Sequence, residues 1–197
     1  MNPDLTAQLP QAQRDRLKHI ELRLRFLGEV RRADLMARFG IQSAAASRDL
    51  ALYKELAPFN AEFDQRSKLY VLGQRFAPLF EAQADQALSW LVEQVGDVVA
   101  PTAESLLPCS MPARLTTPKL DVLAAVTRAI HLRHALEIQY HSISNGQSER
   151  EIVPFALLDT GLRWHVRAYD RKSSEFRDFV LTRIHEPNAA ADRPPLK

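Results

Sequence analysis

The 197-residue sequence predicts an α+β protein with a helical N-terminal half and a β-rich C-terminal half. Apolar residues recur at helical spacing over residues 12–56, whereas from about residue 135 they alternate with polar residues as in half-buried strands. Four prolines interrupt residues 101–118, where no regular apolar period is present. We therefore expect four segments: a helical domain over 12–75, a linker with one helix over 76–119, a β domain over 120–185 and a disordered tail over 186–197.

The first predicted helix covers residues 12–27. Its apolar stripe recurs at intervals of three and four residues, at Leu17, Ile20, Leu24 and Leu27. Two more helices are expected over residues 32–39 and 43–56, separated by a tight turn. Gly40 can adopt the left-handed conformation that ends a helix, and Ser43 can cap the next one.

These two helices have the pattern of a helix-turn-helix, with small and polar residues at the start of the second one. We expect Ser43, Ala44, Ser47 and Arg48 to face the major groove of DNA, because small side chains allow close approach and arginine can bond two guanine acceptors. An ordinary helical hairpin is the alternative. For Arg48 alone, contact with phosphate or pairing with an acid competes with base contact.

A β-hairpin is predicted directly after the helices, with strands at residues 61–64 and 68–72. Three helices followed by a hairpin form a winged helix-turn-helix. Arg66 and Lys68 at the hairpin tip, with Arg31 and Arg32 at the start of the second helix, are placed for backbone phosphate. A solvated turn is the alternative for the two tip residues.

The C-terminal half reads as two helices followed by antiparallel strands. The helices are predicted over 84–95 and 120–132, and the strands over 135–140, 149–158, 162–169 and 176–184. Asn145-Gly146 is a strong hairpin-turn signal, and Pro154 suggests a bend or an edge position. Several short antiparallel strands within about fifty residues predict a small barrel or a strongly bent sheet.

Polar side chains suited to an anionic ligand gather in this β domain. The candidates are Tyr140, Ser142, Arg150, His165, Arg167, Arg177 and Arg183. Alternation places His165 and Arg167 on one face and Trp164 on the other, in the core. Clustered arginines make bidentate contacts to phosphate. The alternative is that they pair with Glu137, Glu149, Glu151 and Asp178 on a solvated sheet.

Composition points away from several protein classes. The net charge is only +2, distributed as +4 over residues 1–80, −4 over 81–126 and +2 over 127–197. Cys109 is the only cysteine, which excludes an intramolecular disulfide and fits a reducing compartment. Without a membrane-length apolar run or a secretory signal at the N-terminus, the chain is expected to be cytoplasmic.

No catalytic motif is present, so we expect neither an enzyme nor a cofactor. The sequence lacks a nucleophile elbow, a P-loop and a dinucleotide-binding glycine pattern. His131 and His134 are three residues apart, but no third metal ligand accompanies them. Surface histidines are the simpler interpretation, and no metal is predicted.

Residues 164–170 and 176–184 resemble the two strands that characterise WYL-domain transcriptional regulators, with His165-Val166 in place of Tyr-Leu. Residues 138–142 and 150–154 fit the same pattern. At the N-terminus, Arg38–Ile41 and 47–58 are similar to the winged helix-turn-helix of the BrxR/CapW-like branch. The resemblance covers residues 14–184.

The resemblance implies an Sm- or SH3-like WYL barrel that senses a ligand, a nucleotide or short nucleic acid, and a chain that acts as a homodimer on a palindromic double-stranded DNA operator. Regulators of this branch lie beside anti-phage defence systems and act mostly as repressors. We therefore expect a ligand-responsive repressor of a phage-defence or neighbouring operon. The alternative is a non-regulatory adaptor that binds nucleic acid or protein. The family usually continues for eighty or more residues beyond Ile184, so we expect this chain to lack most of the usual C-terminal dimerisation domain.

Overall fold

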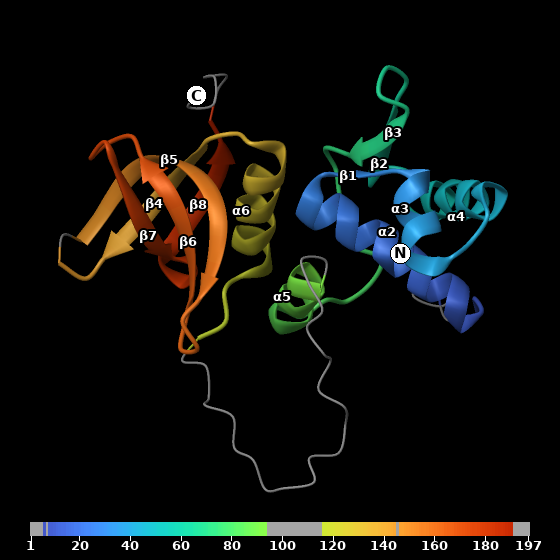
Figure 1. The fold of residues 1–197 in the computed structure, drawn as a ribbon, viewed down its shortest axis with the longest axis horizontal. Coiled ribbons are helices and arrows are strands. Elements are labelled where there is room, and N and C mark those ends of the chain that lie inside the picture. Colours follow the sequence, from blue (N-terminus) through green and yellow to red (C-terminus); the bar gives the residue numbers. More distant parts are fainter. Residues whose placement is uncertain (1–5, 7, 94–115, 145, 191–197) are drawn as a thin grey trace, which may run out of the picture. The chain divides into compact units, whose positions relative to one another are not determined.

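The computed structural model describes residues 6, 8–93, 116–144 and 146–190, and the chain divides into two compact units, residues 1–81 and 82–197 (Figure 1). The first unit is mainly helical and the second is mainly a β-sheet, so the predicted α+β class is confirmed. No helix among the described residues is both long and apolar enough to cross a lipid bilayer.

The described part of the first unit, from residue 8 onward, holds three helices and a small sheet. The helices are α2 (Gln11–Leu27), α3 (Arg32–Phe39) and α4 (Ser43–Leu56), and the strands are β1 (Glu29–Val30), β2 (Ala61–Asp64) and β3 (Leu69–Leu72). The sheet is antiparallel in the order β1-β3-β2. The three predicted helices and the hairpin are therefore confirmed, with α3, α4 and β2 ending at the predicted residues.

The turn between α3 and α4 follows the prediction at one end only. Gly40 ends α3 in the left-handed conformation, with φ of 63°. The expectation that Ser43 caps α4 is wrong, because Gln42 occupies the capping position with extended backbone and without a side-chain hydrogen bond. Ser43 is instead the first helical residue, so its hydroxyl is not used as the cap.

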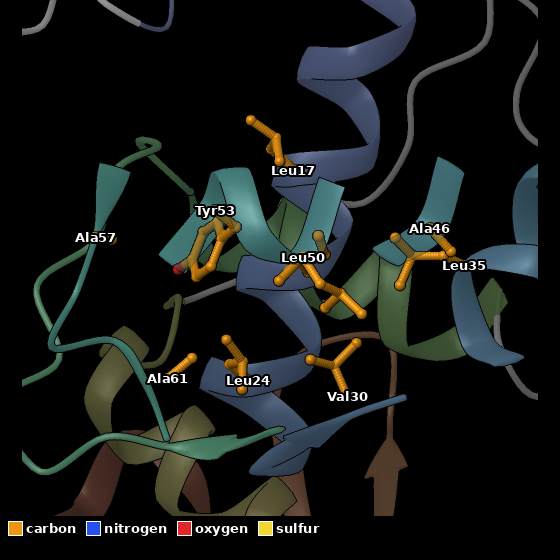
Figure 2. Packing of buried hydrophobic residues seen from close by; sticks show 10 residues of the cluster. Leu17, Leu24, Val30, Leu35, Ala46, Leu50, Tyr53, Ala57 and Ala61 are labelled. Carbon is orange, nitrogen blue, oxygen red and sulfur yellow. The ribbon is translucent and has the colours of Figure 1, made fainter. Parts of the chain in front are cut away.

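The apolar stripe of α2 forms the centre of the first core. Leu17, Ile20 and Leu24 are fully buried and pack with residues of the other two helices, Leu35 of α3 and Leu50 of α4 (Figure 2). Burying side chains of this size stabilises the fold by about 2 kcal/mol each. The opposite face of α4 is thereby left on the surface.

A buried polar network fastens the chain that follows the hairpin. The hydroxyl of Tyr53 donates to a carboxylate oxygen of Glu21 (3.0 Å), and the side-chain amide of Asn60 donates to the Tyr53 oxygen (3.1 Å). The backbone N–H groups of Leu79 and Phe80 donate to the two oxygens of Glu21, at 2.8 and 2.9 Å. The buried Glu21 carboxylate therefore fastens residues 79–80, which lie outside every described helix and strand.

Residues 82–93, 116–144 and 146–190 of the second unit form two helices and a five-stranded antiparallel sheet. The helices are α5 (Ala84–Glu93) and α6 (Leu120–Leu132); the strands are β4 (Leu136–Ser142), β5 (Gly146–Asp159), β6 (Trp164–Asp170), β7 (Glu175–Val180) and β8 (Ile184–Ala189), and the 3-10 turn η1 (Leu181–Arg183) separates the last two. Helix α6 packs against β5 and β8. The strand order is β7-β6-β5-β4-β8, and Figure 1 shows that the sheet is strongly curved.

Two expectations for this unit need correction. In the described part of the chain the strands pair in an open order with β7 and β8 as edges, so the closed barrel is not formed. The tail expected to be disordered from residue 186 onward continues as strand β8 to Ala189, where it pairs with β4. The predicted irregularity at Pro154 is confirmed by a shift of register between Pro154 and Ala156.

Several predicted features lie outside the described residues. These are Cys109, the end of the helix expected over 84–95, most of the proline-rich linker, Asn145 of the turn signal, and residues 191–197 of the tail.

Candidate nucleic-acid interface

The start of α4 presents the predicted recognition residues to the surface. Ser43, Ala44 and Arg48 are exposed and Ser47 is half-buried, whereas Ala46 on the opposite face is fully buried. The first turn and a half of the helix therefore has a narrow polar surface of the width that a major groove accepts.

Arg48 makes no ion pair with any residue that the structure describes, and its neighbour in the chain explains why. Asp49 is buried and binds the guanidinium of Arg16 (Nε to Oδ2, 2.6 Å) and the amide of Gln13 (3.2 Å). Consecutive helical residues point in different directions, so the aspartate cannot serve both arginines. The predicted alternative, an acid paired with Arg48, is not observed among these residues.

A hollow of about 490 Å³ lies between α3, α4 and the hairpin. Four of the predicted DNA-binding residues line it: Arg31, Arg32, Ser47 and Lys68. Its other lining residues are Leu50, Phe63 and Tyr70, and the rings of the last two lie 5.0 Å apart. The structure thus brings cations from two elements and a hydroxyl from a third around one concave surface.

Arg31 is only partly neutralised in this hollow. Its guanidinium lies 3.4 Å from Glu29, yet 55% of its side chain is exposed. Asp34 does not cancel the charge, because its carboxylate accepts the backbone N–H of Arg31 at 2.7 Å and binds the guanidinium of Arg23 at 3.1 Å. The mouth of the hollow therefore carries a net positive charge.

The hairpin tip is held by Asp64. Its carboxylate accepts hydrogen bonds from the backbone N–H of Arg66 (2.9 Å) and from the hydroxyl of Ser67, and its carbonyl oxygen accepts the N–H of Lys68 (2.9 Å). The hydrogen bond from Ser67 is the main cause that lowers the pKa of Asp64. Both predicted cations of the tip are exposed.

The seven residues predicted for a ligand in the second unit are divided between the two faces of the sheet. The strand register puts Arg150 opposite Ile138, on the face that also carries Tyr140, whereas His165 and Arg167 lie on the face opposite Trp164. Trp164 is 7% exposed, so its predicted place in the core is confirmed.

Three of the predicted arginines are bound to carboxylates. Arg150 lies 2.6 Å from the fully buried Asp170, Arg167 makes a bidentate pair with Asp178 (2.8 and 3.0 Å), and Arg177 lies 2.7 Å from Glu175. Pairing with acids is therefore the predicted alternative, although Asp178 is the one partner here that the prediction named; Asp170 and Glu175 were not among its four acids.

The other four predicted residues have few polar contacts. The Tyr140 hydroxyl accepts the backbone N–H of Val180 at 3.3 Å, and the hydroxyls of Ser142 and Ser144 are 3.1 Å apart. Nδ1 of His165 is buried and has no hydrogen-bond partner among the described residues. Arg183 lies half-buried in η1.

Sequence reasoning missed an aromatic surface beside Arg167. Phe176 contacts Phe155 and Tyr169 edge to face, with ring centroids 5.8 and 5.3 Å apart, and 71% of Phe176 is exposed. Alternation could have placed Tyr169 next to His165 and Arg167, but the contact with Phe155 depends on the register shift after Pro154, which no local pattern fixes.

The chain matches models of two known protein families. Residues 12–93 match the winged helix-turn-helix domain of the BrxR transcriptional regulator, and residues 121–188 match the WYL domain. The chain joins a BrxR-type winged helix domain to a WYL domain. The first of these domains contains the α4 surface and the hollow, and the second contains the five-stranded sheet.

Relatives of this winged helix–WYL chain include DNA-binding transcriptional repressors called CapW. That of Escherichia coli strain KTE188 is 34% identical over 189 residues, which are 91% of this chain and 62% of the relative. Those of Pseudomonas aeruginosa and Stenotrophomonas maltophilia are 36% and 33% identical over 87% of this chain and 60% of each relative. The chain is homologous to CapW repressors and spans about three fifths of their length.

Among solved structures, Proteasome accessory factor B/C (PafBC) of Arthrobacter aurescens aligns with 92% of this winged helix–WYL chain and 35% of its own, at 19% identity and a TM-score of 0.35. A similarity of this size does not bear on the fold.

Proposed function

We propose that the chain is a sequence-specific DNA-binding transcriptional repressor. The observation that carries the proposal is the exposed start of α4, where Arg48 has no carboxylate partner among the described residues and lies beside a hollow lined by cations. The homologous CapW proteins are named DNA-binding transcriptional repressors, which supports the same role here.

In this proposal α4 enters the major groove. Ser43, Ala44, Ser47 and Arg48 face the base edges, with Arg48 reading guanine. The cations at the start of α3 and at the hairpin tip bind backbone phosphates on either side: Arg31, Arg32, Arg66 and Lys68. The hollow between them takes a phosphate with its sugar, because cations line its mouth and apolar rings line its wall.

The rest of the proposed mechanism concerns regulation. Two copies bind a palindromic operator, with each half-site one helical turn apart. A nucleotide or short nucleic acid binds the WYL domain and favours the DNA-free arrangement, which shifts the population away from the operator. His165 and Arg167, on one face of β6, are the residues proposed to meet this effector. The regulated genes form a phage-defence operon or a neighbouring one. The protein acts in the cytoplasm, by binding DNA rather than by catalysing a reaction.

Binding to the duplex upstream of the chain's own gene tests the proposal. The wild type should prefer that duplex over a scrambled one, and Arg48→Ala should weaken binding about tenfold or more, since a bidentate arginine–guanine contact contributes about 1–3 kcal/mol. Lys172→Ala removes the same charge from an exposed position in the WYL domain and should leave binding within about twofold. Equal affinity of the wild type for both duplexes would contradict the proposal.

An adaptor that uses the exposed aromatic surface of Phe155 and Phe176 is the competing function. Such a module would not need Arg48. Retention of specific binding by Arg48→Ala would therefore favour the adaptor.

A further inference from the structure

The shape of the hairpin tip depends on one side chain. Asp64 is the last residue of β2 and pairs with Leu69, so residues 65–68 form the whole connection. The Asp64 carboxylate binds the N–H of Arg66 and the hydroxyl of Ser67, and its own carbonyl binds the N–H of Lys68. Three successive residues of the connection are thus tied to a single position.

This arrangement holds Lys68 in an uncommon backbone conformation. Its φ is 57°, in the left-handed region that residues with a side chain rarely adopt. The conformation turns the chain into β3 and determines the direction in which the lysine side chain leaves the hairpin. Lys68 also lines the hollow with Arg31 and Arg32, so its direction determines whether the three cations converge.

We infer that Asp64 is a positioning residue for DNA binding: it fixes the turn at residues 65–68 so that Arg66 and Lys68 meet backbone phosphates. The inference rests on the proposed function. It assigns to an acidic residue, which would repel DNA by its charge alone, a net favourable part in binding.

Charge and geometry make opposite predictions for this residue, and that makes the inference testable. Removing a carboxylate from a surface that faces DNA ordinarily strengthens binding, because fewer negative charges oppose the phosphates. If Asp64 positions the tip, its loss instead weakens binding, because Arg66 and Lys68 must then be ordered when the DNA binds.

Three variants separate the two effects. Asp64→Ala removes the charge and the hydrogen bonds. Asp64→Asn removes the charge and retains an oxygen that can accept the N–H of Arg66. Glu62→Ala removes an equal charge from an exposed position on the same strand. Against the upstream duplex, we expect Asp64→Ala to bind five- to tenfold more weakly than the wild type, and Asp64→Asn and Glu62→Ala to bind as tightly as the wild type or up to threefold more tightly.

A measurement without DNA completes the test. Backbone ¹⁵N relaxation should show increased fast motion at residues 65–68 in Asp64→Ala and unchanged order in Asp64→Asn, while the thermal midpoints confirm that both are folded. If the wild type binds specifically and Asp64→Ala binds as tightly as Glu62→Ala, the Asp64 inference is overturned and the proposed function stands. If the wild type shows no preference for the upstream duplex, both are overturned.

Discussion

Arg48 is free to contact DNA in the proposed complex because Asp49, the next residue in the chain, is paired with Arg16. Asp49 leaves only 3% of its side chain exposed and lies against Arg16 of α2, which is 18% exposed. A carboxylate withdrawn from water in this way is stabilised only while its partner is present. The pair therefore fastens α4 to α2 at the turn that carries Ser47 and Arg48, two of the proposed recognition residues.

A double-mutant cycle should measure this fastening. Asp49→Leu alone leaves Arg16 without its carboxylate, and Arg16→Met alone leaves Asp49 buried without its cation, so each should destabilise the winged helix by about 2 kcal/mol. The double variant should lose less than the sum, with a coupling energy of about 1–3 kcal/mol in urea unfolding. A coupling energy near zero would show that the pair contributes nothing beyond packing.

His19 makes the stability of the winged helix depend on pH. Its ring is buried edge to face against Phe39, with centroids 5.4 Å apart. Burial, aided by the charges of Arg23 and Arg38 and opposed by that of Asp34, lowers the pKa of His19 from 6.5 to about 4. The folded state therefore holds the neutral imidazole, and the unfolded state takes up a proton first as the pH falls.

The stability that His19 contributes should be complete above pH 6.5 and should be lost progressively down to pH 4, by up to about 3 kcal/mol. Urea unfolding at pH 7.5, 6.0 and 5.0 checks this. His19→Leu is the control, because it retains Glu21, whose pKa burial raises and whose titration acts in the opposite direction. Parallel pH profiles for the wild type and His19→Leu would contradict the assignment.

At the scale of elements, local patterns predicted the helices better than the strands. Helices α3, α4 and α6 begin and end at the predicted residues because their apolar periods and their stop signals are local. Strand β8 was missed because residues 186–190 contain Pro187 and small or polar residues. A proline is tolerated there because β8 is an edge strand that pairs only with β4.

The same reasoning explains how far the candidate site could be predicted. Exposure of Ser43, Ala44 and Arg48 follows from helical periodicity within a single element. The pairs of Arg150 with Asp170 and of Arg167 with Asp178 join different strands, so they depend on sheet register. Register is a property of the assembled sheet, so the carboxylate partners of Arg150 and Arg167 could not be determined from the sequence alone.

Gly73 closes the hairpin against the chain that leads into it. A Cβ built there would overlap the carbonyl oxygen of Phe59 and lie 2.9 Å from its carbonyl carbon. Backbone atoms cannot move aside cheaply, so Gly73→Ala should destabilise the winged helix by about 3 kcal/mol in urea unfolding. Gly40→Ala is the matched control: nothing lies within 4 Å of its Cβ, and only the φ of 63° is strained, at about 1 kcal/mol. Equal losses would disprove the steric explanation.

At the scale of the whole molecule, the proposed affinity for DNA depends on the charge of the surface formed by α4, the start of α3 and the hairpin tip more than on the net charge of +2. The four proposed phosphate contacts predict how the association constant for DNA depends on salt. Its logarithm should fall with log[salt] with a slope of about −4 for one winged helix, and of about −7 for two copies bound to one operator. Lys68→Ala should reduce the slope by about one for each winged helix in a fluorescence anisotropy titration. A slope near zero would show that these cations do not bind backbone phosphates.

The buried Glu21 carboxylate has a consequence for solvent isotope exchange. The amides of Leu79 and Phe80 lie outside every helix and strand, yet both donate to this one side chain. Their protons can be replaced by deuterium only when the hydrogen bonds to the Glu21 carboxylate break. The same opening leaves the Tyr53 hydroxyl without its acceptor. These two amides should therefore exchange together, at a rate typical of a helix interior rather than of a loop.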